Sequence, residues 1–166
     1  MQISRRHFLL AGSALAGISA VSLWRPAGEA SAATESFPFT LSDAEWKARL
    51  SAQSYDVLRH EGTERAFTSP LLDEHRPGTF DCAGCGQKLF DAATKFESGT
   101  GWPSFYDFIP GAIGSKTDTS LFMTRTEVHC SNCGGHQGHV FEDGPPPTGL
   151  RYCINGVSLT FTPKTA

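Results

Sequence analysis

The hydrophobic pattern of the first half of the chain is that of short helices. The stretch FTLSDAEWKARL places Ser42 three residues ahead of Glu45, the spacing of a capping box, and predicts that a helix starts there. A second helix is predicted in AQSYDVLRHEG, where Tyr55 and Leu58 fall on one side and Gly62 marks the end. We therefore expect two short helices near the start of the folded part.

After Arg65 the pattern changes to that of β-structure. Gly, Pro and Thr separate short runs rich in aromatic and β-branched residues, namely GTFDC, QKLF, TSLFMTRTEVHC, GHVFED and LRYCINGVSLTFT. Within the last run, residues 150–161 are interpreted as one strand, which would place Arg151, Cys153 and Asn155 on the same face. The pattern predicts a mainly β fold with antiparallel strands, in a single domain over residues 34–166.

The first residues have the layout of an export signal. SRRHFLLAGSALAGISAVSLW has a basic start and an apolar middle, and small residues follow in EASAA. The twin arginine resembles signals read by the bacterial twin-arginine translocase. We expect residues 1–33 to be cleaved near Ala32 or Ala33, and the protein to be periplasmic or otherwise extracytoplasmic. A retained membrane anchor is the alternative, because the apolar run is nearly long enough to span a bilayer.

Composition limits the domain count and the kind of partner. With 166 residues, of which 39% are hydrophobic, the chain has room for one core. The net charge is -3, and it becomes -5 without the first 32 residues, which hold three arginines and one glutamate. An acidic body argues against nucleic acid as the main partner, because nucleic acid requires clustered Lys and Arg.

Four of the five cysteines form two matched pairs. CAGC contains Cys82 and Cys85, CSNC contains Cys130 and Cys133, and 44 residues separate the pairs. Two such knuckles from distant loops can close on one tetrahedral Zn²⁺. Because four sulfur ligands leave no open position, we expect one structural zinc ion per chain.

The glycines after each pair, Gly86 and Gly134, suit the tight turn that a knuckle needs. Two disulfides are the alternative in an exported chain, although a C-x-x-C loop closed on itself would be small and strained. A thioredoxin-type redox pair is a further alternative, but that motif belongs at a strand-to-helix junction that the pattern does not predict here.

The fifth cysteine, Cys153, has polar neighbours. A lone cysteine is most often a small buried hydrophobe, so core packing is the simplest interpretation. Arg151 and Asn155, on the same predicted face, are poor partners for core packing, whereas they suit a lowered thiol pKa and a polar substrate. Cys153 is therefore a candidate nucleophile.

Two other motifs supply candidate partners for such a thiol. In HCSNCGGHQGHVFEDG, His136 and His139 are candidate proton donors, with a second metal site or a plain surface position as the alternative. In GTGWPSFYDF, Trp102 lies in a turn between Gly101 and Pro103, where it could form an apolar wall for a ligand or pack in the core.

Together these motifs carry a family resemblance. CAGC, SGTGWPSF, HCSNCGGHQGHVFEDGP and RYCINGVSLTF resemble the defining blocks of the B-type methionine sulfoxide reductases, which reduce the R epimer at sulfur. The resemblance covers nearly the whole chain after the signal. It implies two antiparallel β-sheets with N-terminal helices, Cys153 as nucleophile, and Zn²⁺ held by Cys82, Cys85, Cys130 and Cys133.

The resemblance also implies an activity, the repair of oxidised proteins. The substrate would be methionine-R-sulfoxide, mainly in proteins or peptides, and its reduction would leave a sulfenic acid on Cys153. His136 and His139 would deliver protons, in roles that could be exchanged, while Asn155 and Arg151 would orient and polarise the site.

The resemblance assigns two further positions near the thiol. Trp102 would contact the S-methyl group of the substrate. Many relatives have a cysteine at the position of Thr100, where it resolves the sulfenic acid as an internal disulfide, so an external thiol from a thioredoxin-like partner is expected here. A non-catalytic zinc-ribbon binding module and a thiol peroxidase or oxidant sensor are the rival classes, and the combination of Trp102, the histidine pair and Asn155 favours the reductase.

Overall fold

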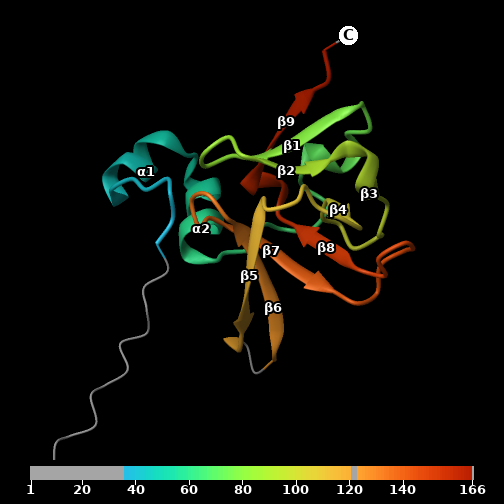
Figure 1. Cartoon of the computed structure of the whole chain (residues 1–166). Coiled ribbons are helices and arrows are strands. Elements are labelled where there is room, and N and C mark those ends of the chain that lie inside the picture. The colour runs from blue at the N-terminus through green and yellow to red at the C-terminus, as the bar shows by residue number, and fades with distance from the viewer. Residues whose placement is uncertain (1–35, 121–122, 166) are drawn as a thin grey trace, which may run out of the picture. The chain divides into compact units, whose positions relative to one another are not determined.

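The computed structural model describes residues 36–120 and 123–165 (Figure 1). The expected export signal, residues 1–33, lies outside the described residues. In the described part, none of the helices combines the length and the apolar character needed to cross a membrane. This part is mainly β-structure with two α-helices at its start, which confirms the fold class predicted from the sequence.

The two helices begin where the sequence predicts. Helix α1 spans Asp43–Arg49, and its capping box is complete, because the Ser42 side chain accepts from Glu45 N and the Ser42 backbone N–H donates to the Glu45 carboxylate over 2.8 Å. Helix α2 spans Ala52–His60 and buries Val57 and Leu58. The capped ends fix where α1 and α2 start, and the apolar side of α2 attaches it to the sheets.

The strands form two antiparallel sheets. The three-stranded sheet has the order β2-β1-β9 and the six-stranded sheet the order β3-β4-β8-β7-β6-β5. The strands are β1 (Gly78–Cys82), β2 (Lys88–Asp91), β3 (Lys95–Phe96), β4 (Ser104–Phe105), β5 (Ile113–Asp118), β6 (Arg125–Cys130), β7 (His136–Phe141), β8 (Arg151–Ile154) and β9 (Leu159–Pro163). Strand β8, which carries Cys153, is central in the larger sheet and lies between β4 and β7.

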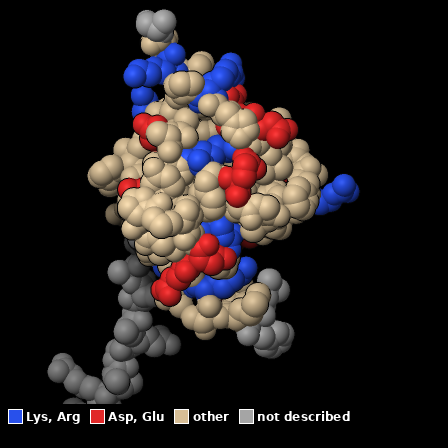
Figure 2. Space-filling model, turned by 90° about the vertical axis from the view of Figure 1, so that its right-hand side faces the viewer, with Lys and Arg blue, Asp and Glu red and all other residues tan. Residues whose placement is uncertain are grey.

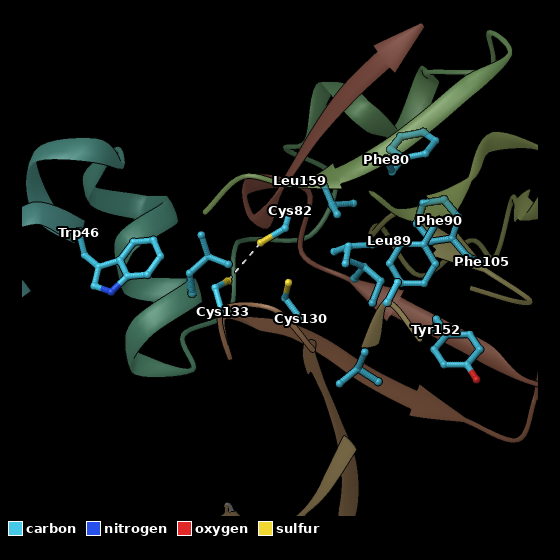
Figure 3. Close-up of a cluster of buried hydrophobic side chains, with 14 residues drawn as sticks. Trp46, Phe80, Cys82, Leu89, Phe90, Phe105, Cys130, Cys133, Tyr152 and Leu159 are labelled. Carbon is cyan, nitrogen blue, oxygen red and sulfur yellow. Dashed lines mark hydrogen bonds between the residues drawn. The ribbon is translucent and has the colours of Figure 1, made fainter. Parts of the chain in front are cut away.

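Aromatic side chains fill the space between the sheets (Figure 3). Phe90 stacks on Phe105 with ring centroids 4.3 Å apart, and Phe80 meets Phe105 edge to face at 4.9 Å. All three rings are fully buried. Burying a phenylalanine side chain contributes roughly 1.5–3 kcal/mol, so this cluster is a main source of stability and holds the two sheets at a fixed separation.

The segment 150–161 is not one strand, which corrects the expectation from its sequence pattern. It forms β8 and β9 in different sheets, separated by a 3₁₀ turn at Gly156–Ser158. The buried Glu64 carboxylate causes the break, because it accepts the backbone N–H of Gly156 and that of Val157 at 3.1 Å. These amides would otherwise continue a ladder, so one carboxylate from a distant loop sends the chain into the second sheet.

The run TSLFMTRTEVHC is likewise shorter as a strand than its composition suggests. Only Arg125–Cys130 is in β6, and the strand paired with it is β5, whose sequence IGSKTD was not recognised as a strand. Most of β5 is partly or fully exposed, with polar side chains on both faces, so it has no apolar alternation to reveal it.

Charged side chains on the face shown in Figure 2 are interspersed. Blue Lys and Arg lie beside red Asp and Glu, among larger uncharged areas. Several contacts pair opposite charges at the surface, including Lys116 with Glu61 at 2.7 Å and Arg76 with Glu74 at 2.5 Å. Such surface pairs contribute little to stability.

Candidate functional site

The two cysteine knuckles have the same backbone hydrogen bonds. The Cys82 carbonyl accepts from Gly86 N and the Cys130 carbonyl accepts from Gly134 N, both over 2.8 Å. Gly86 and Gly134 have φ of 79° and 67°, in the left-handed region that glycine adopts without strain. This confirms the tight turn expected after each pair.

The knuckles bring four sulfur atoms together. The sulfurs of Cys82, Cys85, Cys130 and Cys133 all lie within 4.8 Å of one another. Cys82 Sγ is 3.7 Å from Cys133 Sγ, and Cys85 Sγ is 3.6 Å from Cys130 Sγ (Figure 3 shows the first pair). A disulfide requires about 2.0 Å, whereas a tetrahedral site with metal–sulfur bonds of about 2.3 Å separates its sulfurs by about 3.8 Å.

The chemistry of this donor set also suits a metal ion. Hydrogen bonds among the four thiols raise the pKa of Cys82 and Cys133, while they lower the pKa of Cys85 and Cys130. Without a cation the four cannot all ionise, and a divalent cation would stabilise four thiolates at once. The Gln137 side-chain N–H also points to Cys82 Sγ at 3.5 Å, as a partner outside the donor set. The residues therefore fit a bound metal ion.

The second candidate site surrounds Cys153. In the sheet, Cys153 is paired with His139 on β7 and with Ser104 on β4. A hollow of about 160 Å³ opens beside it, lined by Thr63, Trp102, Arg125, Gly138, His139, Phe141, Cys153 and Asn155. Four of the six residues singled out from the sequence thus line one hollow, namely Cys153, His139, Trp102 and Asn155.

The environment of the Cys153 thiol corrects one expectation. Burial raises its pKa above the ordinary value, and the charge of Arg151 opposes that rise without cancelling it. The sequence suggested a lowered pKa because it showed the polar neighbours but not the depth of the thiol. The resting thiol is therefore protonated at neutral pH, and a base is needed to ionise it.

A carboxylate orients His139. Its Nε2 lies 2.8 Å from Asp118 Oδ2, which also accepts from Arg125 Nη2 at 2.7 Å. Hydrogen bonds from Ser120, then from His139 and Arg125, hold the pKa of Asp118 well below its usual range. An ionised carboxylate only accepts, so the proton of the neutral ring is on Nε2 and Nδ1 has a lone pair. Burial lowers the pKa of His139, against the opposing effect of Asp118, and keeps the ring neutral at pH 7.

The structure separates the two histidines that the sequence could not separate. Among the described residues His136 lies behind the lining of the hollow rather than in it, and it is 2% exposed. Its Nδ1 lies 2.7 Å from Glu127 Oε1, and its ring meets the His139 ring edge to face at 5.5 Å. His136 is therefore placed to support the His139 ring.

Trp102 lies in a loop at the hollow, half-buried. Its indole N–H donates to the Glu64 carbonyl over 3.1 Å, which fixes the ring. Gly101 before it has φ of 91°, and a Cβ there would lie 2.8 Å from the ring of Phe67. The loop is thus held rigidly, and Trp102 and Phe141 supply the aromatic part of the lining.

Arg151 and Asn155 are both held by other groups. Arg151 makes two hydrogen bonds to the Asp143 carboxylate, at 2.8 and 2.9 Å, and its guanidinium lies 4.4 Å from the Phe141 ring centroid. The Asn155 side chain accepts from Glu64 N and donates to the Gln137 carbonyl, each over 3.0 Å. Asn155 lies just after the end of β8, and its amide ties the turn there to two neighbouring segments.

Several residues of the site carried no signal in the sequence. Asp118 and Arg125 come from the β5–β6 hairpin, Glu64 from the loop after α2, and Asp143 from the loop after β7. Each is an ordinary charged residue in a polar stretch. The pairing of β5 with β6, and of β6 with β7, brings Asp118 and Arg125 to His139.

Comparison with known proteins agrees with this geometry. The family model described as the SelR domain matches residues 50–163. The peptide methionine sulfoxide reductase MsrB of Thiobacillus denitrificans is 56% identical over 124 residues, which are 74% of this chain and 94% of that protein. The protein of that name from Methanosarcina barkeri is 60% identical over 121 residues, 72% of this chain and 85% of its own length.

A third relative of that name, from Agrobacterium fabrum, is 52% identical over 123 residues, 74% of this chain and 91% of its own. The match runs from the start of α2 to the end of β9 and includes both knuckles and the hollow. These matches confirm the resemblance seen in the sequence motifs. The chain therefore belongs to the MsrB family of SelR-domain proteins.

Proposed function

We propose that this protein reduces methionine-R-sulfoxide in peptides and proteins to methionine, with Cys153 as nucleophile. One observation carries the proposal: a thiol, a neutral histidine and an aromatic wall face the same hollow of about 160 Å³. The printed names of the relatives, peptide methionine sulfoxide reductase, support the same reaction.

Cys153 and His139 divide the chemistry. His139 Nδ1 takes the thiol proton, the thiolate attacks the sulfoxide sulfur, and the proton passes to the sulfoxide oxygen as the S–O bond breaks. The attack joins the two sulfurs, and the oxygen leaves as hydroxide. The hydroxide then adds to the Cys153 sulfur as the sulfur–sulfur bond breaks and methionine departs, so Cys153 becomes a sulfenic acid, oxidised by two electrons, and the substrate sulfur is reduced by two. Asp118 keeps the His139 ring in the tautomer that can accept.

The asymmetry of the hollow supports selection of one epimer. A sulfoxide sulfur carries an oxygen, a methyl group and the side-chain arm. His139 and Arg125 offer polar groups to the oxygen, while Trp102 and Phe141 offer aromatic surface to the methyl group. With the arm directed to solvent, only one hand of the sulfur presents all three groups correctly to Cys153.

Arg151 and Asn155 act on the site without being its reagents. The Arg151 guanidinium, held by Asp143, stabilises negative charge at Cys153. Asn155 fixes the turn after β8 through Glu64 and Gln137, and so fixes the wall of the hollow. Both are positioning or electrostatic residues.

The knuckles bind Zn²⁺ in a structural role, with Cys82, Cys85, Cys130 and Cys133 as its four ligands. Four thiolates complete a tetrahedron, so the ion supplies folding energy and no open coordination position. With these sulfurs committed, the described residues contain no further cysteine to resolve the Cys153 sulfenic acid. An external thiol, from a thioredoxin-like partner, therefore reduces it.

Residues 1–33 direct export through the twin-arginine translocase to an extracytoplasmic compartment. The support is the sequence layout alone, since these residues lie outside the described ones. Replacing Arg5 and Arg6 together by lysine should retain the protein in the cytoplasm, which cell fractionation and the mass of the secreted chain would measure. Secretion of the double variant at the normal level would contradict the assignment.

The first experiment uses purified protein, racemic N-acetyl-methionine sulfoxide and dithiothreitol, with chiral chromatography of the remaining substrate. We expect the R epimer alone to disappear, and Cys153→Ser to abolish its loss. If neither epimer is consumed by folded, metal-loaded protein, a binding module is favoured. Fast reaction with peroxide and no preference between epimers would favour a peroxidase.

A further inference from the structure

A row of three hydroxyl groups connects the Cys153 thiol to a backbone carbonyl. Thr100 Oγ1 lies 3.9 Å from Cys153 Sγ, a long contact of the kind sulfur makes. Ser98 Oγ lies 2.8 Å from Thr100 Oγ1 and 2.7 Å from Ser104 Oγ. Ser104 Oγ donates to the Trp102 carbonyl over 3.1 Å. Because Ser104 is 1% exposed and pairs with Cys153 in the sheet, both ends of the row are fixed.

The direction of each hydrogen bond follows from the number of protons. A hydroxyl has one proton to donate, and a carbonyl oxygen can only accept. Since Ser104 donates to Trp102, Ser98 must donate to Ser104 and Thr100 must donate to Ser98. Thr100 Oγ1 then offers sulfur only a lone pair, so it accepts the S–H of Cys153.

Ionisation of the Cys153 thiol reverses the hydrogen-bond role required of the Thr100 hydroxyl, from acceptor to donor. A thiolate needs a donor, and the only proton on Thr100 Oγ1 is already shared with Ser98. Thr100 can turn to the sulfur by giving up Ser98, or all three hydroxyls can reverse and Ser104 lose Trp102. Either way the row loses one hydrogen bond when Cys153 becomes charged.

We propose that Ser98, Thr100 and Ser104 are positioning residues that keep Cys153 as a thiol in the substrate-free protein, by presenting an acceptor to its proton. The inference deepens the proposed function and rests on Cys153 being the nucleophile. Restraint of the free thiol would protect it from stray oxidants until a sulfoxide provides somewhere for the proton to go.

Other charged groups act on the same thiol and stay constant in the test. His139 faces Cys153 from β7, Arg151 precedes it by two residues on β8 and is paired with Asp143, and Arg125 lines the hollow from β6. None of these four donates to or accepts from the hydroxyl row. Substitutions within the row therefore change the hydrogen bonds at sulfur while the surrounding charges remain.

The test measures the rate of Cys153 alkylation by iodoacetamide against pH, with the modified residue located by mass spectrometry. Ser98→Ala removes the competing acceptor, so Thr100 can donate to the thiolate. We expect the apparent pKa of Cys153 to fall by about half a unit, a roughly threefold faster reaction below that pKa. Thr100→Val removes the donor and should give a higher apparent pKa than Ser98→Ala gives.

The decisive comparison is the double variant. In a Thr100→Val background, Ser98→Ala should cause no further fall, because its effect passes through the Thr100 hydroxyl. A fall of the same size in that background, or no fall in Ser98→Ala alone, would overturn the proposal. Thr94→Val, which removes a hydroxyl that bonds the Asp91 and Asp107 carbonyls, should leave the pKa unchanged.

Thermal melting verifies that each variant is folded. Alkylation needs no sulfoxide, so failure of this proposal and failure of the reductase assignment are distinguishable. If the protein reduces only the R epimer but Ser98→Ala leaves the pKa of Cys153 unchanged, the proposal about the hydroxyl row is wrong and the reductase assignment stands. If Ser98→Ala lowers the pKa of Cys153 as expected but no sulfoxide is reduced, the reductase assignment is wrong, while the effect of the hydroxyl row on the thiol stands.

Discussion

The two sulfur sites of this protein are built in different ways. The knuckles repeat one local design twice, in which the backbone around each C-x-x-C pair curls through a glycine and aims both sulfurs inward. The hollow at Cys153 has no such local design, because its thiol, histidine and tryptophan come from three separate segments. The knuckles fix where distant chain segments meet. The hollow at Cys153 forms only once the segments of the fold are in place.

Breaking the knuckles should have the largest effect on the molecule. Cys130→Ser removes one of the four proposed ligands, at a fully buried position. Structural Zn²⁺ contributes on the order of 10 kcal/mol in small zinc domains, which is comparable to the whole stability of a domain. We expect loss of bound metal and of cooperative unfolding, measured by metal analysis and by thermal melting.

The matched control is Cys153→Ser, the same atom exchange at the other site. It should bind metal fully and melt close to the parent protein. If Cys130→Ser also kept its metal and its melting temperature, the knuckles would not be a structural metal site, and the contrast between the two regions would collapse.

Cys153→Ser should have the largest effect on chemistry. Loss of a nucleophile typically lowers kcat by roughly 10⁴-fold or more, because no other group can form the covalent intermediate. Consumption of methionine-R-sulfoxide at saturating dithiothreitol measures it. Activity within tenfold of the parent protein would show that the thiol is not the reacting group.

The orienting carboxylate gives a smaller and more specific effect. Asp118→Asn removes the acceptor that keeps the proton of His139 on Nε2, so kcat should fall by about a hundredfold. In the proposed mechanism His139 acts as a neutral base, so activity should be lost as pH falls through its pKa, which burial holds below the ordinary value. Asp118 opposes the lowering of the His139 pKa, so Asp118→Asn should move the acid limb of the profile of kcat against pH to lower pH.

Lys116→Gln is the control for Asp118→Asn, because it also removes a charge from β5, on a side chain that reaches Glu127 and Glu61. It should leave the acid limb in place. An unchanged profile in Asp118→Asn would mean that another residue orients His139.

Thr100→Cys should change the route of turnover more than its rate. The Thr100 hydroxyl already contacts Cys153 at 3.9 Å, so a thiol there can attack the sulfenic acid. We expect a disulfide between positions 100 and 153 after one turnover without reductant. Thiol titration would show the loss of two free thiols, and mass spectrometry the loss of two hydrogens. The parent protein should instead retain a Cys153 sulfenic acid, which dimedone would trap.

The sequence predicted the first region better than the second, for a physical reason. Knuckle geometry is set within a few residues, so spacing and the following glycine reveal it. Cys153, His139 and Trp102 were found because each has unusual neighbours in the chain. Asp118 could not be found, because its role depends on the register of β5, β6 and β7 and its own stretch looks like a polar loop.

The break between β8 and β9 was missed for the same kind of reason. Alternation of side chains continues through INGVS, and nothing local shows that a buried carboxylate at position 64 captures the backbone there. Because of this error Asn155 was expected within a strand, whereas its side chain holds the turn after β8. A competing long-range hydrogen bond can thus override a correct local pattern.

Gly138, which lines the hollow without offering it any side chain, will look like an active-site residue in a mutational scan. A Cβ there would lie 2.0 Å from the Cys153 carbonyl oxygen, so even alanine must push β7 and β8 apart beneath the thiol. A scan scored by activity alone would rank position 138 beside position 153. Scoring protein abundance as well would separate the two positions, because only proteins with a substitution at Gly138 should fail to accumulate.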